Sequence, residues 1–342
     1  MKALEKIKIT VMLGGPSAER EVSLRSGATA AKALRSLGHE VQEVDPQNGK
    51  WTLPGGTQVV FLALHGTYGE DGTVQRRLEE LGVPYTGCDP EASRIGFDKY
   101  LTKERLVAAG VPTARFTLID SAQASWPIGW NPPVVLKPAR QGSSVGLQFV
   151  ERVADWGKAL AEAIRYDSQV LMEEKIAGRE CTVGILAEAK SGPLPPHPPL
   201  SRLGQGEGGA VGGEGQTLTA LPILEVQPKA GVYDYQTKYT PGTTDYFCPG
   251  RFDEATTERI QAAALGAFKA IGGRDYSRVD MIVRPSGEPM VLEVNTLPGF
   301  TEVSMYARMW QESGLGYREL LTRLIELGIA RFEARRALAV ER

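Results

Sequence analysis

The amino-acid sequence predicts an α/β protein that begins with an open sheet of mostly parallel strands. Two observations lead to this prediction: continuous apolar runs typical of buried strands, and a helical pattern of apolar residues between them. The predicted elements are a strand from Ile7 to Leu13, a helix from Glu19 to Leu37, and strands from His39 to Val44 and from Val59 to Leu64. Because ligands bind beyond the carboxyl ends of strands in such sheets, the loops after the first and last of these strands are candidate sites.

Both of these loops carry residues suited to binding. Gly14 and Gly15 open the first loop, and Glu19 follows where the helix begins. The alternative for Glu19 is a first-turn acid that the helix dipole favours. His65 starts the second loop, which contains three glycines, and its alternative is a histidine that only caps the turn. Residue types alone leave these alternatives open.

Composition indicates an ordinary globular protein. The chain has 342 residues, of which 23% are charged and 42% are hydrophobic, and its formal net charge is −2. This charge gives no indication of a nucleic-acid surface, and no apolar run approaches the roughly 20 residues of a membrane span. Cys88, Cys181 and Cys248 lack the spacing of a disulfide framework or a zinc site. We therefore expect a cytoplasmic protein that binds neither nucleic acid nor membrane.

The middle of the chain has a pattern suited to phosphate. Lys99 stands at the start of a helix predicted from Asp98 to Ala109, and Lys137 ends a buried strand that begins at Pro133. Residues 140–146, Arg-Gln-Gly-Ser-Ser-Val-Gly, then supply backbone and hydroxyl donors beside a lysine charge. The alternative is a surface hairpin with a serine-rich turn. The apolar run favours the phosphate site, because a lysine there needs a partner of opposite charge.

The segment from Ser277 to Ser304 predicts a β-hairpin that carries acidic residues. β-branched residues alternate with polar ones on both sides of a Pro-Ser-Gly turn. Because side chains alternate between the faces of a strand, two carboxylates, one amide and one guanidinium converge across the hairpin. Hard oxygen ligands of this kind suit Mg²⁺, whereas the alternative is a salt-bridged surface hairpin. The converging residues are Arg278, Asp280, Glu293 and Asn295.

Other segments have weaker patterns. Glu173 and Glu180, on or beside predicted strands, could bracket a nucleotide base and ribose. A loop over residues 230–242 is rich in tyrosine, which favours a binding or covering role. Residues 191–216 are rich in proline and glycine and predict a mobile loop. A strand is predicted from Leu221 to Val226. The leucines of a helix predicted from Tyr317 onward indicate core or dimer packing.

Five motifs in one order make the sequence resemble the D-alanine–D-alanine ligases of the ATP-grasp superfamily. They occupy residues 14–23, 65–72, 137–146, 233–239 and 293–299. The resemblance implies an ATP-grasp fold with three domains: an α/β domain over residues 1–95 for the first D-alanine, and two subdomains, 96–180 and 181–342, that clasp ATP. It also implies the reaction. ATP phosphorylates one D-alanine, the amine of a second attacks the acyl phosphate, and the dipeptide serves peptidoglycan synthesis.

The resemblance implies ligands for the nucleotide and for metal ions. Two Mg²⁺ ions, which Mn²⁺ can replace, would be held by Asp280, Glu293 and Asn295. The lysines that would contact phosphates are Lys99, Lys137 and Lys238. The residues that would meet the adenine are Glu173, Glu174 and Ile176, with Glu180 on the ribose. Glu174 departs from the family, in which a lysine often stands at this position.

The resemblance likewise implies the substrate contacts. The ammonium of the first D-alanine would meet Glu19 and His65, and the second carboxylate would meet Ser304 and the N–H of Met305. Arg278 and the N–H of Gly299 would form the oxyanion site. The residues that would bond to Glu19 and close the loops are Ser143 and Tyr239. The small-molecule partners are thus D-alanine and ATP, and a homodimer is the family's habit.

Two alternatives stay open. A D-alanine–D-lactate or mixed ligase of the same fold would share most of these residues, and the Lys238-Tyr239 pair favours the dipeptide product. A nucleotide-binding regulatory protein without turnover is expected to have lost metal ligands. All three metal-ligand positions, Asp280, Glu293 and Asn295, are present in this chain.

Overall fold

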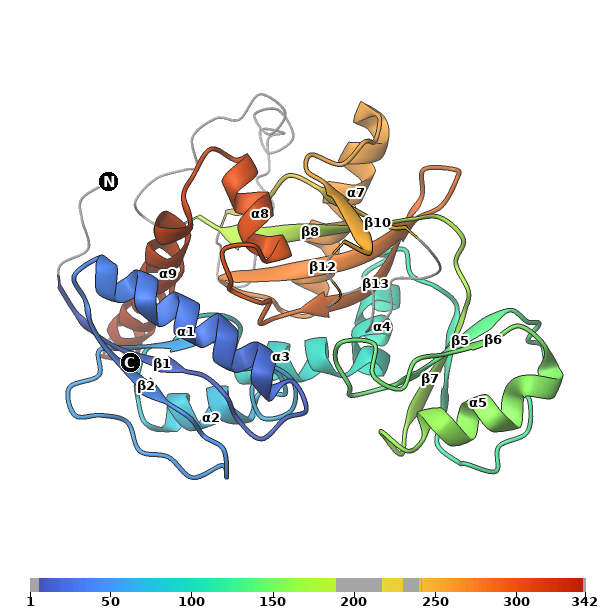
Figure 1. The fold of residues 1–342 in the computed structure, drawn as a ribbon, viewed down its shortest axis with the longest axis horizontal. Helices are drawn as coiled ribbons and strands as arrows, with labels where there is room; N and C mark the ends of the chain where they lie inside the picture. Colours follow the sequence, from blue (N-terminus) through green and yellow to red (C-terminus); the bar gives the residue numbers. More distant parts are fainter. Residues whose placement is uncertain (1–5, 189–216, 230–239, 241, 341–342) are drawn as a thin grey trace.

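The computed structural model describes residues 6–188, 217–229, 240 and 242–340, and three sheets organise this part of the chain (Figure 1). The first sheet is parallel, in the order β2-β1-β3. Its strands are β1 (Lys8–Met12), β2 (Glu40–Val44) and β3 (Val59–Leu62). The predicted open parallel sheet is therefore confirmed.

Helix α1 (Arg20–Ser36) confirms the predicted first helix, and Gly38 follows its end with a φ of 92°. Two further helices near this sheet, α2 (Thr73–Glu80) and α3 (Pro90–Phe97), were not expected from the sequence. Both have only 8 residues, too few for a clear apolar period. The start of α3 is nevertheless well specified, because Asp89 caps it by accepting from the Ala92 N–H, and proline stands at its first position.

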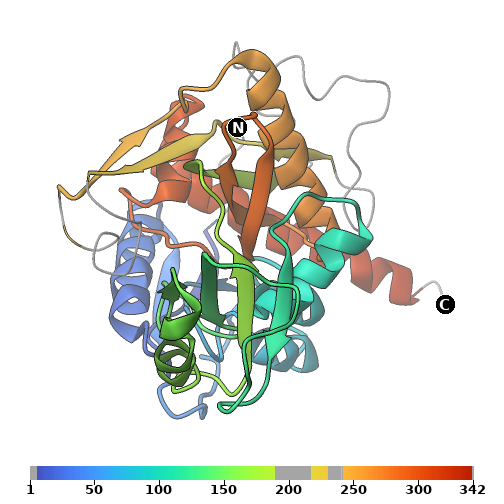
Figure 2. The ribbon, with the colours of Figure 1, turned by 90° about the vertical axis from the view of Figure 1, so that its right-hand side faces the viewer.

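The second sheet is antiparallel, in the order β4-β7-β5-β6. Its strands are β4 (Phe116–Ile119), β5 (Val134–Pro138), β6 (Gln148–Val150) and β7 (Val170–Glu174). The turn η1 (Val153–Asp155) leads into α5 (Trp156–Ala163), which packs on the sheet around a separate core that includes Leu136 and Met172. Figure 2 shows this sheet facing the viewer below the larger one.

The third sheet runs β11-β10-β8-β12-β13, with β9 beside β8. Its strands are β8 (Arg179–Ala187), β9 (Leu218–Ala220), β10 (Leu224–Pro228), β11 (Thr244–Phe247), β12 (Tyr276–Val283) and β13 (Pro289–Asn295). The sequence predicted one strand from Leu221 to Val226. This was wrong in its bounds, because the backbone leaves the ladder between β9 and β10.

The hairpin of β12 and β13 confirms the predicted pairing. Arg278 lies opposite Asn295, and Asp280 lies opposite Glu293. The turn closes where the Gly287 N–H donates to the Arg284 oxygen at 2.8 Å. All four of the converging side chains predicted from the sequence are thus adjacent on neighbouring strands.

The remaining helices join the parts of the fold. They are α4 (Lys99–Ala108), α7 (Glu254–Ala270), α8 (Met305–Glu312) and α9 (Tyr317–Val340). Helix α9 returns to the first sheet and contacts α1 and β3 (Figure 1). Its leucines at 320, 321, 324 and 327 are buried within the chain itself, so they serve the core. The domain division at residues 95 and 180 stays a prediction, and residue 95 lies inside α3. Of the helices described, none has both the length and the apolar character needed to cross a membrane.

Candidate active site

A cavity of about 840 Å³ lies where three parts of the chain meet. They are the loops of the first sheet, the glycine- and serine-containing loop after β5 (residues 140–146) and the β12–β13 hairpin. The structure therefore gathers side chains that are far apart in the sequence. The predicted site residues that line the cavity are Glu19, His65, Lys99, Ser143, Arg278, Asp280, Glu293, Asn295, Gly299, Ser304 and Met305.

The loop after β1 holds Glu19 at the wall of this cavity. Asp45, at the end of β2, accepts from the Gly15 N–H at 3.0 Å and from both terminal nitrogens of Arg20 at 2.9 and 2.6 Å. These bonds fix the backbone on both sides of Glu19. The Glu19 carboxylate makes no capping bond to α1 and instead accepts a hydrogen bond from the Ser143 hydroxyl. The loop after β5 is thereby tied to the first sheet.

Glycine at position 142 allows this contact. A Cβ atom there would lie 2.4 Å from Glu19 Oε2, so any larger residue would push the Glu19 carboxylate out of its present position. Ser143 itself has a φ of 50°, a left-handed conformation that is uncommon for a serine. Strained backbone of this kind is concentrated at functional sites, where the surroundings hold it in place.

Glu19 is partly buried and belongs to an acidic cluster. Glu70 is 8% exposed, and its Oε1 lies 3.6 Å from His65 Nδ1, while His65 Nε2 lies 3.4 Å from the Ser26 hydroxyl. Burial and then the charge of Glu70 raise the pKa of Glu19, against the opposing effects of Ser143, His65 and Lys99. The ionised form of Glu19 is therefore under-stabilised, so a bound ammonium group would be favourable here.

The hairpin presents its carboxylates to the same cavity. Arg278 donates to both oxygens of Asp280, at 2.8 and 2.7 Å, and the Thr182 hydroxyl donates to Oδ1 at 2.6 Å. Lys99 Nζ lies 3.4 Å from Glu293 Oε2. The hairpin therefore contains the salt bridge expected of a salt-bridged surface hairpin, but this salt bridge lies in a cavity. The side chains of Asp280 and Glu293 are only 14% and 28% exposed.

These donors fit a magnesium ion. The described residues contain no cluster of three or more His, Cys, Asp or Glu side chains that could enclose a metal. Two carboxylates and the amide of Asn295 are instead an open set of hard oxygen ligands. Mg²⁺ is usually bound in this way, with waters and substrate phosphates completing its shell.

The cavity also includes the beginning of α8. Ser304 caps this helix, accepting from the Ala307 N–H at 3.3 Å, and Met305 is the first helical residue. The partial positive charge of a helix N-terminus favours a carboxylate at this point. Gly299 is close by, since a Cβ there would lie 4.0 Å from Ser304 Cβ. The predicted carboxylate and oxyanion positions are therefore neighbours.

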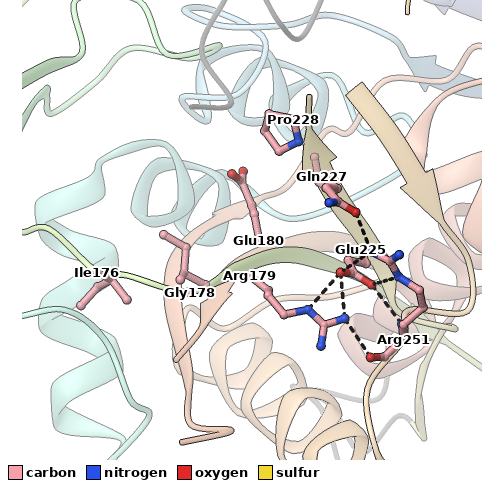
Figure 3. A pocket seen from close by; sticks show the side chains of 10 residues that line it. Ile176, Gly178, Arg179, Glu180, Glu225, Gln227, Pro228 and Arg251 are labelled. Carbon is pink, nitrogen blue, oxygen red and sulfur yellow. Dashed lines mark hydrogen bonds and ion pairs between the residues drawn. The ribbon is translucent and has the colours of Figure 1, made fainter. Parts of the chain in front are cut away.

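A second cavity, of about 600 Å³, is lined by Ile176 and Glu180 (Figure 3). Figure 3 shows Glu225 between the guanidinium groups of Arg179 and Arg251 at its wall. Of the other predicted nucleotide residues, Lys99 lines the first cavity, whereas Lys137, Glu173 and Glu174 line neither. Glu174 pairs with Arg284 at 2.9 Å on the surface, whereas Glu173 and Lys137 form a buried ion pair. Lys238 and Tyr239 are outside the described residues.

Comparison with known proteins identifies the family. The family model "D-ala D-ala ligase C-terminus" matches residues 108–196 and 208–326, and "D-ala D-ala ligase N-terminus" matches residues 53–88. A D-alanine–D-alanine ligase of Methylacidiphilum infernorum is 38% identical over 95% of this chain and 97% of its own length. The chain belongs to the D-alanine–D-alanine ligase family. The ligase of Aquifex aeolicus is also 38% identical, over 93% of this chain and its entire length.

Solved structures of the family confirm the ATP-grasp fold. The D-alanine–D-alanine ligase of Coxiella burnetii superposes with a TM-score of 0.80 at 27% identity, covering 98% of this chain and 97% of its own. The Bacillus anthracis ligase complexed with ATP gives a TM-score of 0.76 at 27% identity, covering 96% of this chain and 99% of its own. The predicted family and fold are both confirmed.

Sequence reasoning missed several residues of this ligase-family site. Glu70 stands in the loop predicted to bind, so its position was a usable signal. Arg308, which stacks on Tyr246 at 5.0 Å and donates to the Val303 oxygen at 3.0 Å, had no such signal. Lys103 had none either, because a helical lysine in a sequence is indistinguishable from a solvated one.

Proposed function

We propose that this family member uses ATP to join two D-alanine molecules into D-alanyl-D-alanine. The observation that carries the proposal is one cavity that contains an acidic cluster, a helix N-terminus and a pair of hairpin carboxylates. These features match the ammonium and carboxylate groups of amino acids and the charge of phosphates. The names of the relatives support the same reaction, and the ATP complex of the Bacillus anthracis ligase supports the nucleotide.

The side chains divide the work between two steps. Glu19, with His65 beside it, would hold the ammonium of the first D-alanine, whose carboxylate oxygen attacks the γ-phosphorus of ATP and displaces ADP. Lys99 and Lys137 would neutralise the phosphates during this transfer between two anions. The product of the step is D-alanyl phosphate, which the closed cavity must protect from water.

The second step joins the two amino acids. The helix N-terminus at Ser304 and Met305 would orient the second D-alanine through its carboxylate. Its neutral amine attacks the acyl carbon, an oxyanion develops, and phosphate leaves as the nitrogen loses a proton. Arg278 and the Gly299 N–H would stabilise the oxyanion.

Asp280, Glu293 and Asn295 would hold Mg²⁺, which Mn²⁺ can replace. When bound, the ions supply charge neutralisation at the phosphates. The contacts of Lys238 and Tyr239, the adenine contacts at Glu173, Glu174 and Ile176, and the ribose contact at Glu180 stay predictions. The homodimer and the cytoplasmic location also stay predictions, and the supply of dipeptide for peptidoglycan synthesis is what the family leads us to expect.

The test is a competition assay. D-alanine, D-lactate, D-serine and L-alanine are offered together with ATP and Mg²⁺, and the products are identified by mass spectrometry. We expect D-alanyl-D-alanine to dominate and to disappear when ATP is omitted. If a depsipeptide dominates, the second substrate has been wrongly identified as D-alanine. The absence of any ATP-dependent product would overturn the proposal.

A further inference from the structure

A buried group of three charged residues joins α4, β5 and β7, and one of them, Lys137, is affected by the charge of the cavity residue Glu293. Glu173, on β7, is 2% exposed and forms an ion pair with Lys103 through one carboxylate oxygen and with Lys137 through the other. Lys103, on α4, is fully buried, whereas Lys137, on β5, is 14% exposed. The three residues are called the lysine triad below. Two lysines share one carboxylate, so the triad carries one net positive charge when all three groups are ionised.

The environment of the triad favours the charged forms of Glu173 and Lys137 and disfavours the charged form of Lys103. Burial alone would raise the pKa of Glu173, but the charges of Lys103 and Lys137 outweigh it and lower the pKa. Burial would lower the pKa of Lys137, and Glu173 outweighs that effect. For Lys103 burial dominates, and its pKa is lowered despite Glu173. Of the three charges, the cation on Lys103 is therefore the least well stabilised. If this position served packing alone, an apolar residue of similar volume would stabilise the fold at least as well.

Lys103 is also connected to the catalytic hairpin. Its Nζ donates to the Thr113 hydroxyl at 2.6 Å, and that hydroxyl donates onward to the Val291 oxygen at 2.7 Å. The Val291 N–H donates to the Pro112 oxygen at 2.9 Å, so both backbone polar groups of this β13 residue are held. Val291 stands two residues before Glu293 on the same strand. One buried lysine thus joins the strand of Lys137 to the strand of a predicted metal ligand.

We infer that Lys103 is a positioning residue for the nucleotide, acting through Glu173 on Lys137 and through Thr113 on β13. The inference rests on the proposed function, because it concerns the same ATP site. Its physical basis is the competition for Glu173. While Lys103 occupies one oxygen, Lys137 keeps an uncompensated share of its charge for phosphate. Without Lys103, Glu173 and Lys137 form a neutral pair, and the attraction for phosphate falls.

The central experiment compares three variants by calorimetric titration with ADP and Mg²⁺ in the absence of D-alanine. Lys103→Met keeps the volume and removes the charge, and we expect the Kd for ADP to rise about 10- to 100-fold, as for the loss of a charge-assisted contact. Thr113→Val breaks only the link to β13, and we expect a rise of about threefold. Lys158→Met, on an exposed face of α5, is the matched control and should leave the Kd unchanged.

A purely structural role would not produce this pattern. The KM for D-alanine should stay within about twofold in Lys103→Met while the KM for ATP rises, and a general loss of folding would change both. If the two residues form one connection, Lys103→Met combined with Thr113→Val should lose less than the sum of the single variants. Should Lys103→Met fail to fold, the Thr113→Val titration still decides.

Two outcomes overturn the inference: ADP affinity within twofold of wild type in both folded variants, or equal losses for D-alanine and ATP. The design also separates it from the proposed function. A wild-type chain that binds ADP but makes no dipeptide would overturn the reaction and leave the inference standing. A wild-type chain that binds no ADP would overturn both.

Discussion

Glu19 is partly buried and Glu173 is fully buried, and the charges that surround these two glutamates are opposite. Glu19 lies beside another acid, Glu70, and burial together with that charge raises its pKa. Glu173 lies between two lysines, which overcome its burial and lower its pKa. One cluster therefore has too much negative charge for its environment, and the other has too much positive charge.

The difference shows how the charges of the free protein can determine which ligands a site prefers. Charges that are imperfectly balanced in the free protein are costly, and a ligand of complementary charge recovers that cost on binding. The cluster at Glu19 is complementary to an ammonium group. The lysine triad is complementary to phosphate. The two clusters thus favour the binding of the two reactants, an amino acid and ATP.

The largest effect is expected at Glu293, which lies between the two clusters. Its Oε2 is 3.4 Å from Lys99, and its charge contributes to raising the pKa of Lys137. In Glu293→Gln the positive groups lose their counter-charge and Mg²⁺ loses a carboxylate, so kcat for phosphate release should fall about 1,000-fold or more. Thermal unfolding serves as the folding control. A rate within threefold of wild type at saturating Mg²⁺ would disprove the metal role.

A smaller and more selective loss is expected at the acidic cluster. Glu19→Gln removes the charge that would hold the first ammonium, and kcat/KM for D-alanine should fall about 100-fold, as for a buried charge pair that loses one partner. The KM for ATP should change less than threefold, because the nucleotide depends on the other cluster. Steady-state kinetics with each substrate varied separately gives both values.

The pH dependence of this loss has a definite sign. Because the pKa of Glu19 is raised, protons reach its carboxylate at pH values above its ordinary 4.5. The KM for D-alanine in the wild type should therefore rise as the pH falls towards that range, and the KM of Glu19→Gln should not follow it. Parallel profiles for the two proteins would mean that Glu19 does not hold the ammonium.

The same contrast explains what could be read from the sequence. The hairpin was predicted down to its facing residues, because a period of two fixes which side chains share a face. The lysine of β5 was recognised as needing a counter-charge, but Glu173 could not be assigned to it, because the pairing of β5 with β7 is a tertiary fact. Lys103 was invisible for the same reason. The predicted strand bounds near Leu221 were wrong because the apolar residues run on without a break, whereas the strand hydrogen bonds are interrupted between β9 and β10.

The smallest effect is expected at Glu225. Like Glu173, it pairs with two cations, but these cations are exposed to solvent. Its side chain is 4% exposed, whereas the side chains of Arg179 and Arg251 are 46% and 50% exposed. Burial alone would raise the pKa of Glu225, but hydrogen bonds from Arg251 and Arg179 lower it to about 2. Water solvates the excess charge of the arginines, so this cluster should contribute to stability without attracting phosphate.

We expect Glu225→Gln to lower the free energy of unfolding by only about 1–2 kcal/mol near pH 7, since solvent screening of the arginines discounts the pKa shift. The folded pKa lies below the ordinary 4.5, so the contribution is complete above pH 4.5 and is lost as the pH falls towards 2. Urea unfolding of both proteins between pH 7 and pH 3 should therefore show curves that converge in acid. Glu162→Gln, which breaks a surface pair with Arg165, is the matched control and should change stability by less than about 0.5 kcal/mol. A difference that persists unchanged at pH 3 would mean that Glu225 stabilises the fold by packing, and exposure of the cations would then not be what separates this cluster from the lysine triad.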